Sequence, residues 1–170
     1  MSTAVQTSYG FGFPKGVAGG LFDLSAHDVT TRQAEGDGVA FGLGVVVGTN
    51  KGTDVKLPAT GATSDDFEGV VVHNSVMVEK DMDNNVSIDS KRTVGCLHFG
   101  RIWVQTGEKA KPVYKDKVFL ITDGAEAGKF TTSADSSATK VEVNAIFLGE
   151  TDDGIANVEF RPGAVVKNAE

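Results

Sequence analysis

Three histidines and one cysteine are the side chains of this sequence best suited to metal binding or catalysis. His27, His73 and His98 are far apart along the chain, and none lies at a metal-ligand spacing from another or from Cys96. Zinc sites draw on histidine and cysteine at short, regular spacings, so the sequence predicts no zinc site. We expect His98 to be hydrogen-bonded in the interior or at an interface, and His73 to face solvent at a strand end.

Cys96 lies inside an apolar run, where a buried small side chain is favoured over a reactive thiol. As the single cysteine of the chain, it cannot form an internal disulfide. Arg101 and Trp103 could suggest a binding platform. On so acidic a chain, however, a structural salt bridge and a packed indole are favoured.

The acidic stretch 81–85 (DMDNN) has oxygen donors at alternate positions, as calcium loops do. A helix–loop–helix calcium loop needs glycine at its sixth place and glutamate at its twelfth, which here are Val86 and Arg92. We therefore predict a solvated turn. Asp65-Asp66 and Asp152-Asp153 are likewise expected to be turn acids that favour solubility.

The sequence contains neither a phosphate-binding loop nor the glycine pattern that surrounds a catalytic serine. Gly10-Phe11-Gly12 and the glycines near 42–48 are not followed by a lysine-serine or lysine-threonine pair, nor by a strand-to-helix transition. No serine lies in the glycine pattern of a nucleophile elbow. We expect no catalytic residue, no cofactor and no metal, so the protein is not predicted to be an enzyme.

The elements expected to position these residues are strands. The stretch 94–104 (VGCLHFGRIWV) carries apolar side chains on both faces and is broken by Gly95 and Gly100. Such a strand belongs in the middle of a sheet that curls or closes, with its bends at the glycines. Two alternating runs on either side of Asp153-Gly154 predict a hairpin.

Further short apolar runs recur at spacings near ten residues, and glycine is abundant at 21 residues. The predicted strands cover residues 29–33, 39–47, 55–57, 67–73, 76–79, 86–88, 118–122, 130–132, 141–148 and 155–160. With no long helix in sight, the pattern indicates an all-β barrel or sandwich, β-tulip-like in character. We expect a single domain over residues 25–163 and a flexible tail over residues 164–170.

Residues 1–24 combine glycine with large apolar side chains. Tyr9, Phe11 and Phe13 are interspersed with glycine, and Phe22 and Leu24 follow a second glycine-rich stretch. Glycine at this density holds no regular element, yet so many large apolar groups are not normally left in water. An extended N-terminal arm that lies on a neighbouring subunit or partner explains both facts. An arm that folds back on its own domain explains them equally well.

The formal charge of −7 comes from 16 basic and 23 acidic side chains. An acidic surface repels phosphate backbones, so a nucleic-acid partner is disfavoured. The first ten residues lack the basic start and apolar block of a signal peptide, and no apolar run approaches the roughly 20 residues that cross a bilayer. We expect a soluble protein made in the cytoplasm, without a membrane partner.

Four pieces of the chain together resemble the structural cement proteins of tailed-bacteriophage capsids. They occur in the family's order and span nearly the whole sequence. These pieces are Gly16-Val17-Ala18-Gly19, Gly100-Arg101-Ile102-Trp103-Val104, Gly128-Lys129-Phe130 and the hairpin from Ile146 to Phe160. The chain departs from the family's pattern in a longer, more polar region at 48–66 and in its C-terminal VVKNAE.

The resemblance implies an auxiliary capsid protein with a β-rich body and an extended arm, made in the cytoplasm of a bacterial host. Such proteins bind the exterior of the expanded head between capsomers of the major capsid protein, commonly as homotrimers and sometimes as dimers, and stabilise the shell. They have no catalytic residues to transfer. We expect the inter-subunit or capsid contacts to come from five arm residues: Tyr9, Phe11, Phe13, Phe22 and Leu24.

Two other functions remain open. A receptor- or glycan-binding head fibre would also be all-β and multimeric, but it would carry aromatic residues on its loop tips, where residues 58–66 and 133–138 are mostly Ser, Thr, Ala and Asp. A major shell subunit would usually carry a long helix, which the sequence does not predict.

Overall fold

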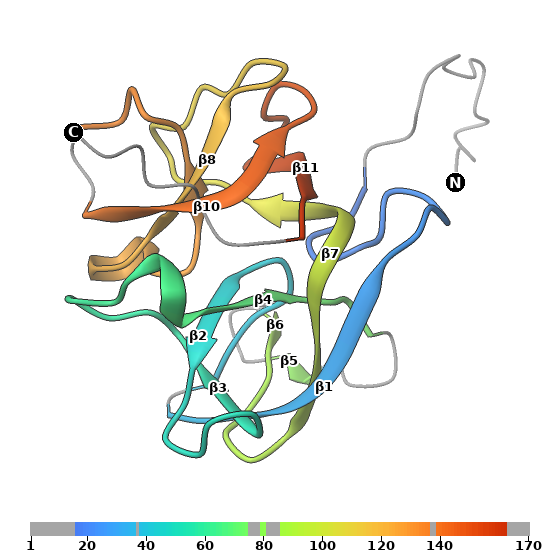
Figure 1. Ribbon diagram of the computed structural model, residues 1–170, viewed down its shortest axis with the longest axis vertical. Helices are drawn as coiled ribbons and strands as arrows, with labels where there is room; N and C mark the ends of the chain where they lie inside the picture. The colour runs from blue at the N-terminus through green and yellow to red at the C-terminus, as the bar shows by residue number, and fades with distance from the viewer. Residues whose placement is uncertain (1–15, 37, 75–78, 81–85, 137–138, 163–170) are drawn as a thin grey trace, which may run out of the picture.

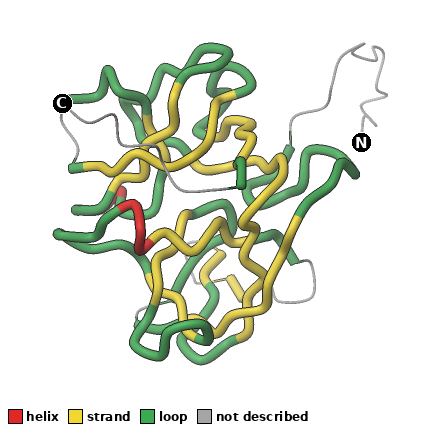
Figure 2. The backbone as a smooth tube through the Cα atoms, in the orientation of Figure 1, coloured by secondary structure: helices red, strands yellow, loops and turns green. Residues whose placement is uncertain are grey.

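The computed structural model describes residues 16–36, 38–74, 79–80, 86–136 and 139–162, and over these residues the protein is all-β (Figures 1 and 2). Helical structure there is limited to two short 3₁₀ turns, η1 (Ser64–Asp66) and η2 (Gly124–Glu126). The predicted fold class is confirmed. The strands are β1 (Asp28–Ala34), β2 (Gly44–Val47), β3 (Asp54–Lys56), β4 (Phe67–Val71), β5 (Glu79–Lys80), β6 (Val86–Ser87), β7 (Thr93–Gln105), β8 (Lys117–Ile121), β9 (Phe130–Thr131), β10 (Lys140–Phe147) and β11 (Ile155–Phe160).

The long strand β7 is shared by two parts of the molecule (Figure 1). Its first half pairs with β1 and β4, and because β1 also pairs with β3, the strands β1-β3-β2-β4-β7 close into a barrel. Its second half pairs with β11 and opens the order β7-β11-β10-β8-β9, which we call the second sheet. This sheet also curls back on itself, since Thr106, directly after β7, bridges Phe130 of β9.

The strand β7 is apolar on both faces, as the sequence predicted, and the structure shows that these faces serve two different cores. Cys96 faces the barrel core together with Phe41, Val45 and Val71. Its neighbour Leu97 faces the core of the second sheet. A strand can bury both faces only where material covers each of them, and here the barrel interior and the second sheet do so.

Gly100 provides the predicted bend between the two halves of β7. Its φ of +124° is a conformation that side-chain-bearing residues rarely adopt, and a Cβ there would lie 2.7 Å from the Cβ of His27. Glycine is therefore required at this point both by the backbone geometry and by the close passage of the chain before β1.

Three aromatic rings dominate the core of the second sheet. Phe130 and Phe160 are buried, with ring centroids 5.8 Å apart, and Phe67 of β4 stacks on Phe160 at 5.7 Å. Because Phe67 comes from the barrel and Phe160 from the second sheet, this stack joins the two parts. Aromatic pairs of this kind contribute about 0.5–1.5 kcal/mol beyond the area that they bury.

The predicted hairpin is confirmed, with β10 and β11 antiparallel and Asp153 and Gly154 both at positive φ, 52° and 77°. The expected strand at 39–47 is wrong in its first half. Only Gly44–Val47 is strand, because Gly42 at φ +76° turns the chain and Val39 instead bridges Ile88. Of the predicted strand at 76–79, residues 76–78 lie outside the described residues.

Candidate functional site

Residues 16–24, which we call the arm root, lie along β7 and are bonded to it (Figure 1). The amide of Gly19 donates to the carbonyl of Trp103 at 2.7 Å, and the amide of Trp103 donates to the carbonyl of Gly20 at 2.9 Å. Leu21 bridges Ile102, and the amide of Phe22 donates to the carbonyl of Arg101 at 3.0 Å. The arm root therefore behaves as an added edge strand of the body.

The glycines of the arm root permit this close approach. A Cβ on Gly16 would lie 2.1 Å from Nε1 of Trp103, and Gly19 has a φ of +77° with its Cβ position 2.7 Å from the carbonyl oxygen of Val71. Phe22 packs on the same indole, with ring centroids 5.8 Å apart. Trp103 is thus a packed indole, as the sequence predicted.

A salt-bridge network holds the end of the arm root. The guanidinium of Arg101 donates to Glu159 at 2.9 Å and to Asp23 at 3.1 Å, so it links β7, β11 and the arm root. Hydrogen bonds from Ser25 and then the contact with Arg101 lower the pKa of Asp23, while Glu159 and Asp23 raise the pKa of Arg101. The predicted structural role of Arg101 is confirmed.

The five predicted contact residues fall into three groups. Tyr9, Phe11 and Phe13 lie outside the described residues. Phe22 is half-buried and packs on Trp103 of its own chain. Leu24 is 96% exposed, the most exposed large apolar side chain among the described residues. The arm root therefore folds onto its own domain, and Leu24 with the exposed Val17 remains free to meet another molecule.

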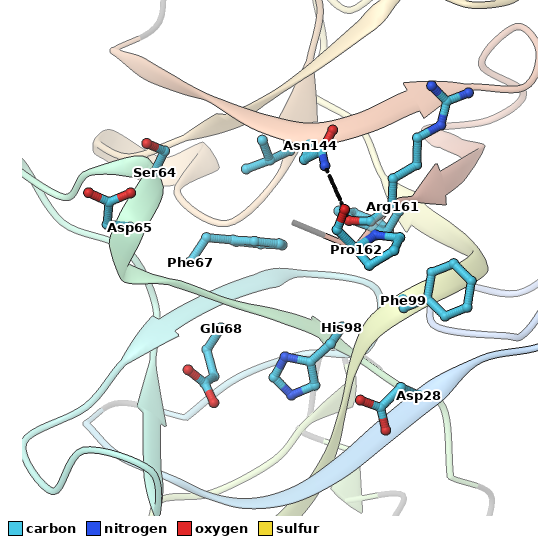
Figure 3. Close-up of a pocket in the computed structure, with 12 residues that line it drawn as sticks. Asp28, Ser64, Asp65, Phe67, Glu68, His98, Phe99, Asn144, Arg161 and Pro162 are labelled. Carbon is cyan, nitrogen blue, oxygen red and sulfur yellow. Dashed lines mark hydrogen bonds between the residues drawn. The ribbon is translucent and has the colours of Figure 1, made fainter. Parts of the chain in front are cut away.

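A groove opens between the barrel and the second sheet (Figure 3). Its volume is about 430 Å³, and apolar side chains line it from both parts of the molecule: Phe67, Phe99, Val143, Phe160 and Pro162. Charged groups also line it, three of them acidic and one basic: Asp28, Asp65, Glu68 and Arg161. Sequence reasoning did not find this groove, because its residues come from segments far apart in the chain.

Sequence reasoning also missed an exposed tip between β7 and β8. Val113 and Tyr114 are 53% and 64% exposed, and lysines flank them on both sides. Two large exposed side chains next to each other form an apolar spot that is not needed for folding. The signal was present in the sequence as the segment KPVYK in an otherwise acidic chain.

The cysteine and the histidines, which are the side chains best suited to catalysis or metal binding, take part in packing and hydrogen bonding. Burial raises the pKa of the Cys96 thiol to about 12, which agrees with the expected unreactive side chain. His98 is half-buried and bonds through Nε2 to the hydroxyl of Thr30 at 2.5 Å, as predicted for a satisfied histidine, and His73 is exposed. Among the described residues, no three His, Cys, Asp or Glu side chains gather closely enough to hold a metal ion.

Asp66 differs from the simple turn acid that the sequence indicated. Its carboxylate accepts hydrogen bonds from the amide and the hydroxyl of Thr63, at 2.9 and 2.8 Å, and thereby holds the turn η1 in place. These bonds lower the pKa of Asp66.

The acidic stretch 81–85, for which a solvated turn was predicted, lies outside the described residues. None of the helical turns in the described part of the chain could span a membrane.

Comparison with known proteins agrees with this picture of a structural module. No curated protein matches the sequence. Among solved structures, a chain from the capsid of Myoviridae phage XM1 is similar, with a TM-score of 0.68 and 21% sequence identity over 92% of this chain and 97% of that chain. At this identity the likeness shows a shared fold.

The match to a family model is continuous along the chain, whereas the resemblance recognised in the sequence consisted of four separate segments. The structural cement protein family (E217 gp24/Pam3 gp6) matches residues 5–161, which include the arm root, the whole barrel and the second sheet. On the strength of that match, this chain belongs to the family of phage structural cement proteins.

Proposed function

We propose that the protein is a capsid cement protein that binds the outer surface of a tailed-phage head between capsomers of the major capsid protein and stabilises the expanded shell. The observation that carries this proposal is the family match over residues 5–161. Its role is structural and non-catalytic. It is made in the bacterial cytoplasm and ends on the virion exterior, where it also associates with copies of itself.

The arm root supports this proposal by its geometry. Its backbone is bonded to β7, so Gly16, where the arm joins the body, is held at a fixed point beside Trp103. A fixed departure point lowers the conformational entropy that an arm loses when it binds. In this arrangement Tyr9, Phe11, Phe13 and Leu24 contact the shell or a neighbouring subunit, while Phe22 holds the root in place.

Stabilisation of the shell follows from mass action. A protein that binds the expanded shell and not the earlier form lowers the free energy of the expanded form, by about 2.7 kcal/mol per site at a free concentration of 100 times Kd. Many copies add these contributions over one shell, so each individual contact can be modest.

The arm deletion should begin at the first residue and end at residue 15, because residues 16–22 are bonded to the body. The truncated protein and the full chain are added to expanded shells that lack the protein, and occupancy is measured by cosedimentation and by imaging. We expect the truncated protein to fold and to lose occupancy. Deletion of residues 164–170, which also removes a terminal segment, is the control and should retain occupancy.

Full occupancy by the arm-deleted protein would contradict the role of the arm. The positions of the added density test the wider proposal. Density spread over the lattice between capsomers agrees with cement, whereas density at the vertices alone would favour the head-fibre alternative.

A further inference from the structure

The segment from Lys109 to Lys117 has a charge opposite to that of the rest of the chain. It holds four lysines and one aspartate, whereas the remaining residues hold 12 basic and 22 acidic side chains. Lys117 pairs with Glu142 at 2.7 Å. Lys109, Lys111 and Lys115 form no ion pair within the described part of the chain. This segment therefore carries uncompensated positive charge on an acidic protein.

The end of this segment, residues 113–116, is a rigid tip. The amide of Val113 donates to the carboxylate of Asp116 at 3.0 Å, and the amide of Asp116 donates back to the carbonyl of Val113 at 3.1 Å. The amide of Lys115 donates to the carbonyl of Phe147 at 2.8 Å, which fastens the tip to β10. The exposed side chains of Val113 and Tyr114 are thus presented on a fixed backbone.

The Lys115 ammonium lies 5.4 Å from the centre of the Tyr114 ring. The tip consequently offers an apolar group, an aromatic ring and positive charge within one turn. Tyrosine on a preordered backbone is typical of residues that dominate protein interfaces, because little rotamer freedom is lost when it is buried.

The groove between the barrel and the second sheet has the complementary chemistry (Figure 3). Glu68 is neutralised by Arg32, with Nε to Oε1 at 2.8 Å, and Arg161 pairs with Glu159 at 3.4 Å. Asp28 and Asp65 are exposed and have no ion pair with any described residue. The groove thus combines an apolar lining with two carboxylates that form no ion pair within the part of the chain that the structure describes.

Tip and groove do not meet within one chain. The residues lining the groove include none from the segment 109–117. At about 430 Å³, the groove is within the range of about 300–1,000 Å³ that accommodates a small ligand, and so has room for one or two large side chains.

We propose that the tip at Val113-Tyr114-Lys115 of one copy docks into the groove of a second copy, with Lys111 and Lys115 facing Asp28 and Asp65. The inference rests on the self-association included in the proposed function and identifies its contact. Such a contact joins two different surfaces, so it gives a reciprocal pair or a ring where the rotation between copies closes, and an open filament where it does not.

Charge reversal tests the pairing in solution by sedimentation over a range of concentrations. The tip variant Lys111→Glu/Lys115→Glu and the groove variant Asp28→Lys/Asp65→Lys should each weaken self-association by about tenfold or more, and a chain carrying all four changes should recover most of it. The control Asp89→Lys/Lys91→Glu reverses two exposed charges at another turn, leaves the net charge unchanged as the fourfold variant does, and should associate like the parent. Thermal unfolding confirms that each variant is folded.

Cross-linking tests the geometry directly. Tyr114→Cys and Asp65→Cys variants are mixed and treated with a short bismaleimide, for which buried Cys96 does not compete. A second pair, Val113→Cys with Ser64→Cys, keeps Tyr114, Asp28 and Asp65 in place, and we expect linked dimers in this mixture and none with either variant alone. A mixture of Val113→Cys and Asp89→Cys is the control and should give none.

Four outcomes would overturn the inference. They are a monomer at every concentration, unchanged association of the reversed variants, no recovery in the fourfold variant, and equal linking to Asp89→Cys. Association that is lost on deletion of residues 163–170 but kept by the tip variants would also overturn it, and would assign the contact between copies to the C-terminal segment. Intact self-association without shell binding would instead contradict the proposed function alone.

Discussion

The indole of Trp103 occupies the space that a side chain at position 16 would need, since a Cβ on Gly16 would lie 2.1 Å from its Nε1. This relationship joins two residues far apart in the sequence and fixes where the chain enters the body. It explains why the Gly-Val-Ala-Gly segment and the Gly-Arg-Ile-Trp-Val segment, both recognised in the sequence, belong to one structural feature.

Replacing Gly16 by alanine should displace Trp103. Overpacking of this kind costs about 1–3 kcal/mol. The chain has a single tryptophan, so its fluorescence spectrum reports this site alone, and we expect a red shift as the indole becomes more exposed. Gly149→Ala is the control, because no atom lies within 4 Å of its Cβ position and its φ is not positive. An unchanged spectrum for Gly16→Ala would contradict the packing described.

Truncating Phe130 to alanine should destabilise the protein by about 3–5 kcal/mol, because its ring is fully buried against Phe67 and Phe160. Tyr114→Ala removes another large aromatic ring, but one that is 64% exposed, and should change the free energy of unfolding by less than about 0.5 kcal/mol. Denaturant unfolding measures both. Similar losses for the two variants would show that the core assignment is wrong.

Stability should fall at acid pH through three carboxylates. Hydrogen bonds from Thr49 lower the pKa of Glu35 below its ordinary 4.5, those from Thr63 lower the pKa of Asp66 below 3.8, and those from Ser25, with Arg101, lower that of Asp23. Because each pKa is lower in the folded state, the stabilisation is present in full above about pH 4.5 and is lost as pH falls through the folded values.

Denaturant unfolding at several pH values between 3 and 7 checks this behaviour. Thr49→Val removes the hydroxyl that bonds Glu35 and should reduce the loss of stability between neutral and acid pH. A variant whose stability falls as steeply as that of the parent would show that this hydrogen bond does not set the pKa of Glu35.

Cys96 should be protected from thiol reagents while the protein is folded. Its pKa is raised by burial from 9.0 to about 12, so its thiolate fraction near pH 8 is about a thousandfold lower, and the side chain is inaccessible as well. We expect labelling at the rate of global unfolding, followed by mass spectrometry. An exposed Asp89→Cys in the same chain should react at the ordinary rate. Fast labelling of both positions would contradict the burial of Cys96.

The sequence predicted those elements whose signals are local. Cys96 and Leu97 on opposite faces of β7 indicated a central strand apolar on both sides, and Asp153-Gly154 between two alternating runs indicated the hairpin. Both signals are contained within a few residues. The prediction of a strand at 39–47 relied on the same kind of local signal and was wrong in its first half, because Gly42 turns the chain inside an apolar run that looks continuous.

The features that sequence reasoning missed depend on contacts between distant residues. The bond from Gly19 to Trp103 and the bridge from Thr106 to Phe130 follow from how the sheets close, which no local pattern encodes. The groove is assembled from five strands, from the turn η1 and from the residues after β11. Of the proposed interface, only the lysine-flanked tip leaves a local signal in the sequence, a reversal of charge along the chain, and this signal was not recognised.

The sharing of β7 has a consequence for how the protein unfolds. Neither the barrel nor the second sheet keeps all of its strands if β7 is assigned to the other, so the two parts are not independent folding units. Heat or denaturant should therefore melt them together in one cooperative transition, and a fragment that ends before residue 93 or begins after residue 105 should not fold by itself. A substitution that destabilises the barrel should consequently lower the stability of the second sheet as well.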